Sequence, residues 1–396
     1  MPEASTGDDR AHALALVSKY GACATAFQTL EPGFRYFWCA NGEACVAYVD
    51  TGSAWVAAGE PIAAPGCAAG AVDEFLAAAR SAGKRACFFG TEQPLATAQC
   101  ESLRALGIGE QPIWDPRTWR ESLAGHRSLR EQLRRARAKG VRVRELTAEE
   151  LEVPEQRERV RRLSERWQAA HAMAKMGFLV QVEPFVCAAQ RRTFVAERAG
   201  ELVGLASAIP VPARGGWFLE DLLRDPLAPN GTGELLVHSL MQWASDAECS
   251  WLTLGLAPLA GRLPWLLRWV RACSSPLYDF GGLRAYKAKF RPSSWQSAYL
   301  CYPPTQSALL TLVDTLSAFA CGSLLGFGLA TLSRSRSLLR ARSFAAQLGP
   351  WALLGPIWAT IAAAGYASLA ACTAAISNVS NSITPRSRSA PRVIGS

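Results

Sequence analysis

Two adjacent acids followed by an arginine, within the segment Phe218–Pro226, are the first residues of this chain whose types could do chemistry. The segment has the pattern of a strand, so alternation should place Glu220 and Asp221 on opposite faces, with Arg224 just past the strand end. An aspartate and an arginine within this reach could clamp a substrate that carries both an ammonium and a carbonyl group. An ordinary ion pair at the end of a strand is the alternative interpretation.

Three further segments that could bind charge follow in the chain. Asn230 and Gly231 open a predicted helix, whose free N–H groups and dipole favour an anion or a developing oxyanion. Gly255 lies in a bend that exposes backbone after the next predicted strand. The segment Tyr286–Pro292 has alternating basic residues, which would share one face of an extended chain: Lys287, Lys289 and Arg291. The sequence shows no Ser/His/Asp or Cys/His triad.

A strongly basic stretch, His126–Arg144, has eight Arg or Lys residues and one acid, Glu131, which gives a local charge of +7. Its apolar residues recur at helical spacing and predict an amphipathic helix over residues 127–139. A second side of this helix presents three arginines: Arg130, Arg134 and Arg137. We expect these three to contact RNA phosphates. An anionic lipid surface or a merely solvated helix are the alternatives.

The elements that must position these residues fall into two similar cycles. In the first cycle we expect strands at 35–39, 44–49, 54–58 and 84–89, with helices at 71–81 and 95–106. In the second cycle we expect a helix at 160–170, a hairpin of 194–197 and 202–209, strands at 216–223 and 251–256, and a helix at 231–244. The pattern predicts an α/β (α+β) fold with two lobes, residues 1–150 and 151–305.

The composition and the C-terminal part set the broad class. The chain has 396 residues, 49% of them hydrophobic, and a net charge of +9, which excludes a disordered protein. Residues 308–333 contain one charge and residues 348–376 none, so we expect a membrane-helix hairpin in the tail 306–396. The polar segment Met1–Arg10 lacks the basic-then-apolar order of a secretory signal, so we expect the lobes to lie in the cytoplasm. Twelve scattered cysteines and four separated histidines indicate neither a metal site nor a disulfide framework, and we expect no cofactor.

Taken together, the segments resemble the C-terminal catalytic domain of the aminoacyl-phosphatidylglycerol synthases, bacterial enzymes with two GNAT-like lobes. Asp221 and Arg224 match the family's Asp-Leu-Met-Arg run, with Leu223 in place of Met, and Lys287 and Arg291 match its Lys-x-Lys-Phe-Arg-Pro run. The resemblance extends over residues 18–303. One departure is Lys175, which lies where the family is expected to have an acid before Gly-Phe.

The resemblance implies transfer of an amino acid from aminoacyl-tRNA to a hydroxyl of a membrane lipid such as phosphatidylglycerol, at the cell membrane. Asp221 would hold the α-ammonium or accept the hydroxyl proton, while Arg224 and Lys287 would stabilise the oxyanion or bind the lipid phosphate. The substrate-binding residues would be Glu220, Asn230, Gly231, Gly255, Lys289 and Arg291.

Other functions remain open from the sequence. An acyl-CoA-dependent N-acyltransferase is one, although Ala228 replaces the first residue of the acyl-CoA phosphate loop. A peptidoglycan-bridge aminoacyltransferase and a non-catalytic, membrane-tethered RNA-binding protein are the others.

Overall fold

The computed structural model describes residues 7–333, apart from 41, 93–101, 171–174, 265–266, 269–270, 273–278, 325 and 332. Thirteen strands of this part form one sheet. In spatial order its main path is β1 (Arg35–Trp38), β2 (Ala44–Asp50), β3 (Ala54–Ala58), β5 (Arg85–Thr91), β13 (Ser294–Tyr302), β6 (Arg104–Trp114), β11 (Leu252–Thr253), β10 (Gly216–Arg224), β9 (Glu201–Val211), β8 (Arg192–Arg198) and β7 (Arg142–Leu146). Two short strands lie beside this path: β4 (Ile62–Ala63) pairs with β2, and β12 (Ala257–Pro258) pairs with β6.

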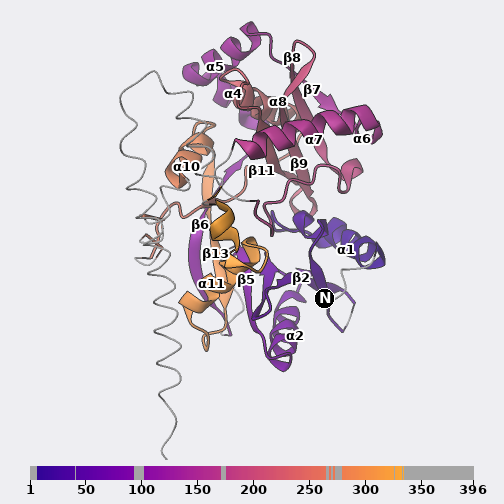
Figure 1. The fold of residues 1–396 in the computed structure, drawn as a ribbon, viewed down its shortest axis with the longest axis vertical. Helices are drawn as coiled ribbons and strands as arrows, with labels where there is room; N and C mark the ends of the chain where they lie inside the picture. Colours follow the sequence, from indigo (N-terminus) through magenta and orange to yellow (C-terminus); the bar gives the residue numbers. More distant parts are fainter. Residues whose placement is uncertain are drawn as a thin grey trace, which may run out of the picture.

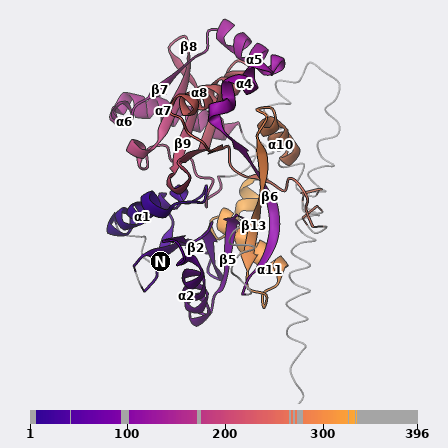
Figure 2. The same cartoon turned by 180° about the vertical axis from the view of Figure 1, so that it is seen from behind.

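Helices cover this sheet. The α-helices are α1 (Gly7–Tyr20), α2 (Ala68–Ser81), α4 (Trp119–Ala124), α5 (Arg127–Ala138), α6 (Ala148–Glu152), α7 (Pro154–Ala169), α8 (Thr232–Asp246), α10 (Phe280–Ala288) and α11 (Ala308–Phe319). The 3-10 helices are η1 (Phe27–Leu30), η2 (Pro116–Thr118), η3 (Ala188–Gln190) and η4 (Pro212–Arg214). Figures 1 and 2 show α2 and β2 at one end of the molecule and α5 and β8 at the other, with β6 and β13 between them.

The same chain path occurs twice in this sheet. Strands β1, β2 and β3 are antiparallel neighbours, and α2 then leads to β5, which is parallel to β3. Strands β8, β9 and β10 repeat the pattern, with α8 leading to β11, which is parallel to β10. A parallel pair requires such a crossover connection. The predicted mixed α/β class and the two similar cycles are confirmed.

The two repeats are joined by strands that cross between them. β13 pairs with β5 on one side and β6 on the other, while β6 also pairs with β11. A strand from near residue 300 therefore lies inside the part of the sheet built by residues 35–114. The division into GNAT-like lobes at residues 150 and 305 stays a prediction.

Most predicted elements of the two cycles are confirmed, but the helix expected at 95–106 is wrong in part. The helix expected at 95–106 overlaps β6, which begins at Arg104 and continues through Gly107. This strand is the central partner of β13, and its tertiary pairing outweighs the local helical pattern. The remainder of the expected helix, residues 95–101, lies outside the described residues, so only its last turn is tested.

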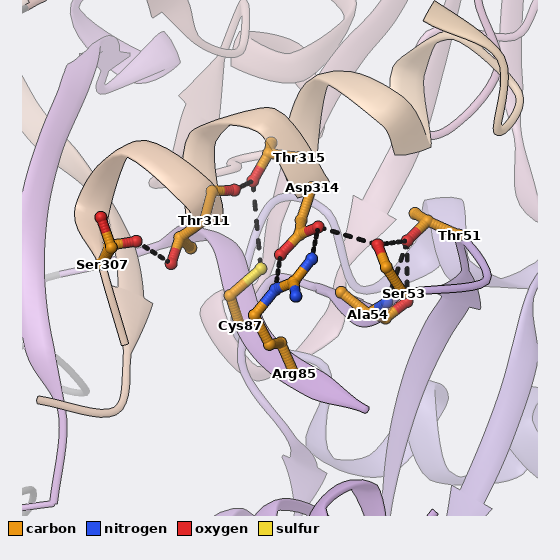
Figure 3. A network of polar contacts seen from close by, with 9 residues as sticks. All are labelled: Thr51, Ser53, Ala54, Arg85, Cys87, Ser307, Thr311, Asp314 and Thr315. Atoms are coloured by element: carbon orange, nitrogen blue, oxygen red, sulfur yellow. Dashed lines mark hydrogen bonds and ion pairs between the residues drawn. The ribbon is translucent and has the colours of Figure 1, made fainter. Parts of the chain in front are cut away.

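The single helix expected over residues 308–333 is wrong, because α11 ends at Phe319 and a turn with positive φ at Cys321 and Gly322 follows. Its one charged residue, Asp314, is 2% exposed and accepts from both Nε and Nη2 of Arg85 at 2.7 Å and from Ser53 Oγ at 3.0 Å. Figure 3 shows this carboxylate between α11 and β5. The acid is therefore part of a buried contact between α11 and the sheet.

Within the described part of the chain, none of the helices combines the length and hydropathy that crossing a bilayer demands. The second expected membrane helix, 348–376, lies outside the described residues.

Candidate functional site

A cavity of about 390 Å³ lies where α5 approaches the beginning of α8. Its lining comes from α5, the end of β10 and the loop that follows: Gln132, Arg135, Lys139, Arg224, Asn230, Gly231 and Glu234. The structure thus brings together residues from two motifs identified in the sequence, Arg224 from one and Asn230 with Gly231 from the other. Three cations and the positive end of a helix dipole face this cavity, which suits an anion.

Gly231 allows the two helices to come this close. It precedes α8 with φ +95°, a conformation that side chains disfavour. A Cβ atom at this position would lie 2.7 Å from the backbone oxygen of Gln132 and 3.1 Å from the Cβ of Ala136, both on α5. The glycine is therefore required by backbone geometry and by the close packing of α5 against the start of α8.

The basic helix forms as predicted, but a different face of it lines the cavity. Leu129, Leu133 and Ala136 are buried against α8 and its neighbours, as their spacing indicates. The cavity residues Gln132, Arg135 and Lys139 recur at i, i+3 and i+7, and the sequence analysis did not single them out.

The three arginines expected to bind RNA lie elsewhere on α5. Arg130 donates to the carbonyl oxygen of Leu123 at 3.1 Å, and Arg134 pairs with Glu131 at 2.8 Å. Arg137 acts on His238, whose pKa is lowered to about 4 by burial and by this guanidinium. Their contact with RNA stays a prediction.

The expectation that Glu220 and Asp221 lie on opposite faces of β10 is wrong. The pairing of β10 with β9 shifts register between Leu219 and Asp221, which leaves Glu220 as the extra residue of a β-bulge. A bulge interrupts the alternation of side chains. Glu220 forms an ion pair with Arg191, and the Asp221 carboxyl also interacts electrostatically with Arg191 and Glu220.

These acids belong to a buried cluster that crosses the two repeats. Arg191, 4% exposed, also pairs with Glu31 at 3.4 Å, and Glu31 is only 2% exposed. Burial, reinforced by the Glu220 carboxylate, raises the pKa of Asp221 well above its ordinary value and also raises the pKa of Glu31. Sequence reasoning missed Glu31 and Arg191, because no local pattern connects residues that far apart.

The basic residues expected on one face of an extended segment lie on different sides, because Phe280–Ala288 is helical. Residues two apart on a helix are about 200° apart around its axis. Lys289 forms a 2.8 Å ion pair with Glu234, which lines the cavity. Arg291 donates to the carbonyl oxygen of Gly125 at 3.3 Å. Lys287 is turned inward.

Lys287 is 7% exposed and donates to the carbonyl oxygens of Gly255 and Leu256 at 2.8 and 2.9 Å. Burial lowers its pKa to about 7, so a substantial fraction of the amine is neutral near neutral pH and can accept a proton. Gly255, with φ +72°, packs directly against the ring of Phe218 on β10. A Cβ atom at this position would lie 2.4 Å from that ring, so a side chain would not fit there. The bend at Gly255 thus links α10 to β10.

Tyr286 is a further residue that the sequence motifs did not assign to the site. Its hydroxyl would lie 2.9 Å from a Cβ atom built at Gly233, in the first turn of α8. The hydroxyl is buried, has no hydrogen-bond partner among the described residues, and interacts electrostatically with Glu234 and Arg224. It therefore lies beside the cavity with its hydrogen-bonding capacity unused.

Residues 14–302 match the protein family described as phosphatidylglycerol lysyltransferase, C-terminal. The chain is 26% identical over 345 residues to the lysylphosphatidylglycerol biosynthesis bifunctional protein LysX of Mycobacterium sp. (strain JLS). That match covers 81% of this chain and 31% of the relative, so the chain spans less than a third of the relative's length. A stretch of 121 residues is 30% identical to the phosphatidylglycerol lysyltransferase of Bacillus subtilis (strain 168), covering 28% of this chain and 14% of that protein.

Two solved structures have a similar fold. The C-terminal domain of a putative lysylphosphatidylglycerol synthetase from Agrobacterium fabrum matches with a TM-score of 0.70 and 25% identity, over 81% of this chain and 99% of that one. L-PGS from Bacillus licheniformis matches with a TM-score of 0.69 and 22% identity, over 81% and 98% of the two chains. Since the family match covers well over half of the 396 residues, this chain belongs to the family of phosphatidylglycerol lysyltransferase C-terminal domains.

Proposed function

We propose that this chain transfers an aminoacyl group from aminoacyl-tRNA to a hydroxyl of phosphatidylglycerol. The observation that carries the proposal is the cavity between α5 and α8, where Arg135, Lys139 and Arg224 surround the beginning of a helix. The names of the relatives support transfer of an amino acid to phosphatidylglycerol. The tRNA donor is our proposal, and the cavity offers a place for such a polyanion. Phosphates of the RNA acceptor end would bind these cations and the α8 N-terminus.

The chemistry is an ester exchange. The lipid hydroxyl attacks the carbonyl carbon of the aminoacyl ester, the bond to the ribose oxygen breaks, and the proton of the lipid hydroxyl finally resides on that ribose oxygen. The ester is already activated, so positioning and stabilisation of the tetrahedral oxyanion supply most of the rate. Arg224 and the N-terminus of α8 are our candidates for the oxyanion.

Lys287 is our candidate for the base. A neutral lysine amine has two N–H groups, and Lys287 has two carbonyl acceptors, which leaves its lone pair for the proton of the lipid hydroxyl. This differs from the phosphate-binding role expected from the sequence, because the lowered pKa makes the amine a poor permanent cation. Asp221 would hold the α-ammonium of the amino acid.

The site also requires access to lipid. The uncharged segment 348–376 would hold the catalytic part at the cytoplasmic face of the membrane, where phosphatidylglycerol is available. We therefore include an anionic phospholipid surface and the cell membrane among the partners of the chain.

Mass spectrometry of total lipids from bacterial cells with and without the full chain tests the proposal. We expect a new aminoacylated phosphatidylglycerol in the cells that express the protein, and its loss with Asp221→Asn or Lys287→Ala, while each variant keeps the unfolding transition of the wild type. An unchanged lipid profile would contradict the proposal. Consumption of acyl-CoA or appearance of a modified peptidoglycan precursor would support one of the other two acyltransferases.

A further inference from the structure

Helix α11 packs with its polar side against the sheet and its apolar side outward. Its buried side chains are three polar ones and an alanine: Thr311, Asp314, Thr315 and Ala318. Leu309, Val313 and Leu316 recur at i, i+4 and i+7 on the opposite side, and Leu316 is 49% exposed. Leu312 and Phe319, between the two sides, pack partly against the core. This is the reverse of an ordinary surface helix, which buries its apolar stripe.

Polar contacts fix this orientation. Asp314 accepts from Arg85 and Ser53, and the hydroxyl of Thr315 donates to the carbonyl oxygen of Thr311 at 2.9 Å. Figure 3 shows these side chains pointing from α11 toward β5 and the loop at Ser53. Rotation of the helix to bury its leucines would separate Asp314 from Arg85, and breaking a buried ion pair is strongly destabilising. The apolar side of α11 is therefore held outward.

The exposed apolar surface continues beyond α11. After the turn at Cys321 and Gly322, the side chain of Leu329 is 70% exposed. The structure describes five exposed large apolar side chains, and Leu316 and Leu329 are two of them. Apolar residues that gather in one exposed segment indicate an interaction surface. Because the family match ends at residue 302, this surface lies outside the part of the chain that the match covers.

A basic pocket of about 190 Å³ adjoins the beginning of α11. Its lining comes from the residues before α11, the end of α2 and the start of β5, and its charged residues are all basic: Arg80, Lys84 and Arg85. Lys84 pairs with Asp50, and Arg85 pairs with Asp314. Arg80 is exposed and forms no ion pair with any residue that the structure describes. The pocket therefore has a free guanidinium, which suits the phosphate of an anionic headgroup.

We propose that the outer side of α11, formed by Leu309, Val313 and Leu316, and this basic pocket dock the protein on an anionic phospholipid bilayer. A helix of 12 residues is too short to cross the hydrocarbon, which needs about 20. A helix that lies in the interface buries only its apolar side, about 5 to 10 Å deep, and is held by cations that bind anionic headgroups. The inference rests on the proposed function, because the lipid acceptor then belongs to that bilayer.

Charge favours a bilayer over a second copy of the chain as the occupant of this surface. In a symmetric dimer both copies would present the same basic pocket, so like charges would meet across the interface. The sequence that follows also points to lipid, because four arginines, Arg334, Arg336, Arg340 and Arg342, precede the uncharged segment 348–376. Arginine clusters beside an apolar segment are typical of contact with anionic lipid.

Photocrosslinking on the full chain tests the inference. A phenylalanine analogue that carries a benzophenone replaces Leu316, or, in the matched control, Val153, which is 45% exposed between α6 and α7. Each protein is reconstituted in vesicles with equal amounts of phosphatidylglycerol and phosphatidylcholine, and mass spectrometry identifies the adducts. We expect lipid adducts at position 316 to exceed those at position 153 at least about fivefold. Adducts of position 316 to a second copy of the chain, or to peptides from 348–376, in place of lipid would overturn the inference.

A second comparison tests the basic pocket. Arg80→Gln with Lys84→Gln removes two of its cations and keeps Arg85, which anchors α11. With the intact pocket we expect adducts of phosphatidylglycerol to be about twice as frequent as those of phosphatidylcholine, and in this variant equally frequent. Arg120→Gln with Arg162→Gln, at exposed positions of α4 and α7, is the matched control and should keep the preference. A preference that survives the loss of the two pocket cations would refute the role of the pocket.

Failure of this inference is distinguishable from failure of the proposed function. Lipid adducts at position 316 of a chain that forms no aminoacylated lipid would support the docking surface and contradict the proposed function. Aminoacylated phosphatidylglycerol formed by a chain whose position 316 crosslinks to protein alone would do the reverse.

Discussion

Replacing Lys287 by methionine should stabilise the protein and abolish its activity. Burial lowers the pKa of Lys287 from 10.5 to about 7. At a pH below both values the lysine is charged in the folded and the unfolded state, and keeping the buried amine charged lowers the stability of the fold by about 5 kcal/mol. Methionine has a similar length and no charge. It also loses two hydrogen bonds, at about 1 kcal/mol each, so we expect a net gain of about 3 kcal/mol at pH 6.

The gain should depend on pH in a defined direction. A depressed lysine pKa means that the unfolded state binds more protons between pH 7 and 10.5, so the stability of the wild type rises with pH through this window. At pH 9 the buried lysine still lowers the stability of the wild type by about 2 kcal/mol. The two hydrogen bonds that the methionine variant lacks are worth about the same, so they offset this difference. The advantage of the variant should therefore shrink from about 3 kcal/mol to about zero.

Urea unfolding of wild type and Lys287→Met at pH 6, 7, 8 and 9 measures this difference. Glu31 and Asp221 change the stability in the opposite direction as pH rises, because their raised pKa values make the folded state bind more protons. This contribution is common to both proteins and cancels in the stability difference between them. A stability difference that is constant over this pH range would show that Lys287 is not desolvated as described. It would also remove the basis for its role as a base.

The other predictions concern the rate, the cavity and the anchoring of α11. The transfer rate at saturating substrates should rise about tenfold per pH unit below pH 7 and level off above it as Lys287 loses its proton, and a flat profile would contradict this. Gly231→Ala should weaken RNA binding at least tenfold and destabilise the fold by about 1 to 3 kcal/mol, because the added Cβ would meet the backbone of Gln132 on α5. Gel-shift assays measure the binding, and unfolding assays measure the stability. Replacing Arg135 and Lys139 by Gln should raise the KM for aminoacyl-tRNA and flatten its salt dependence more than replacing Arg130, Arg134 and Arg137 by Gln. The reverse order would place the RNA on the face of α5 that presents Arg130, Arg134 and Arg137. Asp314→Ala should destabilise the fold by about 2 kcal/mol and make α11 more sensitive to proteolysis, because Arg85 then lacks its carboxylate partner. An unchanged cleavage rate would show that this ion pair does not hold α11 against the sheet.

Local patterns predicted the frame of this site well. The apolar spacing of Leu129, Leu133 and Ala136 predicted the basic helix, and the residues before α8 predicted a glycine-dependent helix start. Arg224, Asn230 and Gly231 converge because the crossover from β10 to β11 brings the end of one element to the beginning of the next. These features depend on contacts close in sequence, which a pattern can encode.

The features that the sequence did not predict depend on distant contacts. The bulge at Glu220 is set by the pairing of β10 with β9, and it turns two acids that alternation would separate toward the same arginine. Glu31 joins that arginine from about 160 residues away. The segment at Lys287 had a basic alternation that fits a strand, but its packing against the loop at Gly255 favours a helix.

The apolar segment that includes Asp314 illustrates the same limit. Its composition predicts a membrane helix, because a single acid in an apolar run is compatible with a span. Arg85 of β5 and Ser53 supply partners for that acid, so the first half of the segment packs on the sheet instead. No property of residues 308–333 alone reveals those partners.

Reconstitution tests the central claim most directly. The purified full chain is mixed with aminoacyl-tRNA labelled on the amino acid and with vesicles that contain phosphatidylglycerol, and labelled lipid is measured by mass spectrometry. We predict label in phosphatidylglycerol that depends on intact RNA and on Asp221, and none when the lipid is phosphatidylcholine. Absence of labelled lipid from a folded protein that binds both substrates would contradict the proposed aminoacyl transfer.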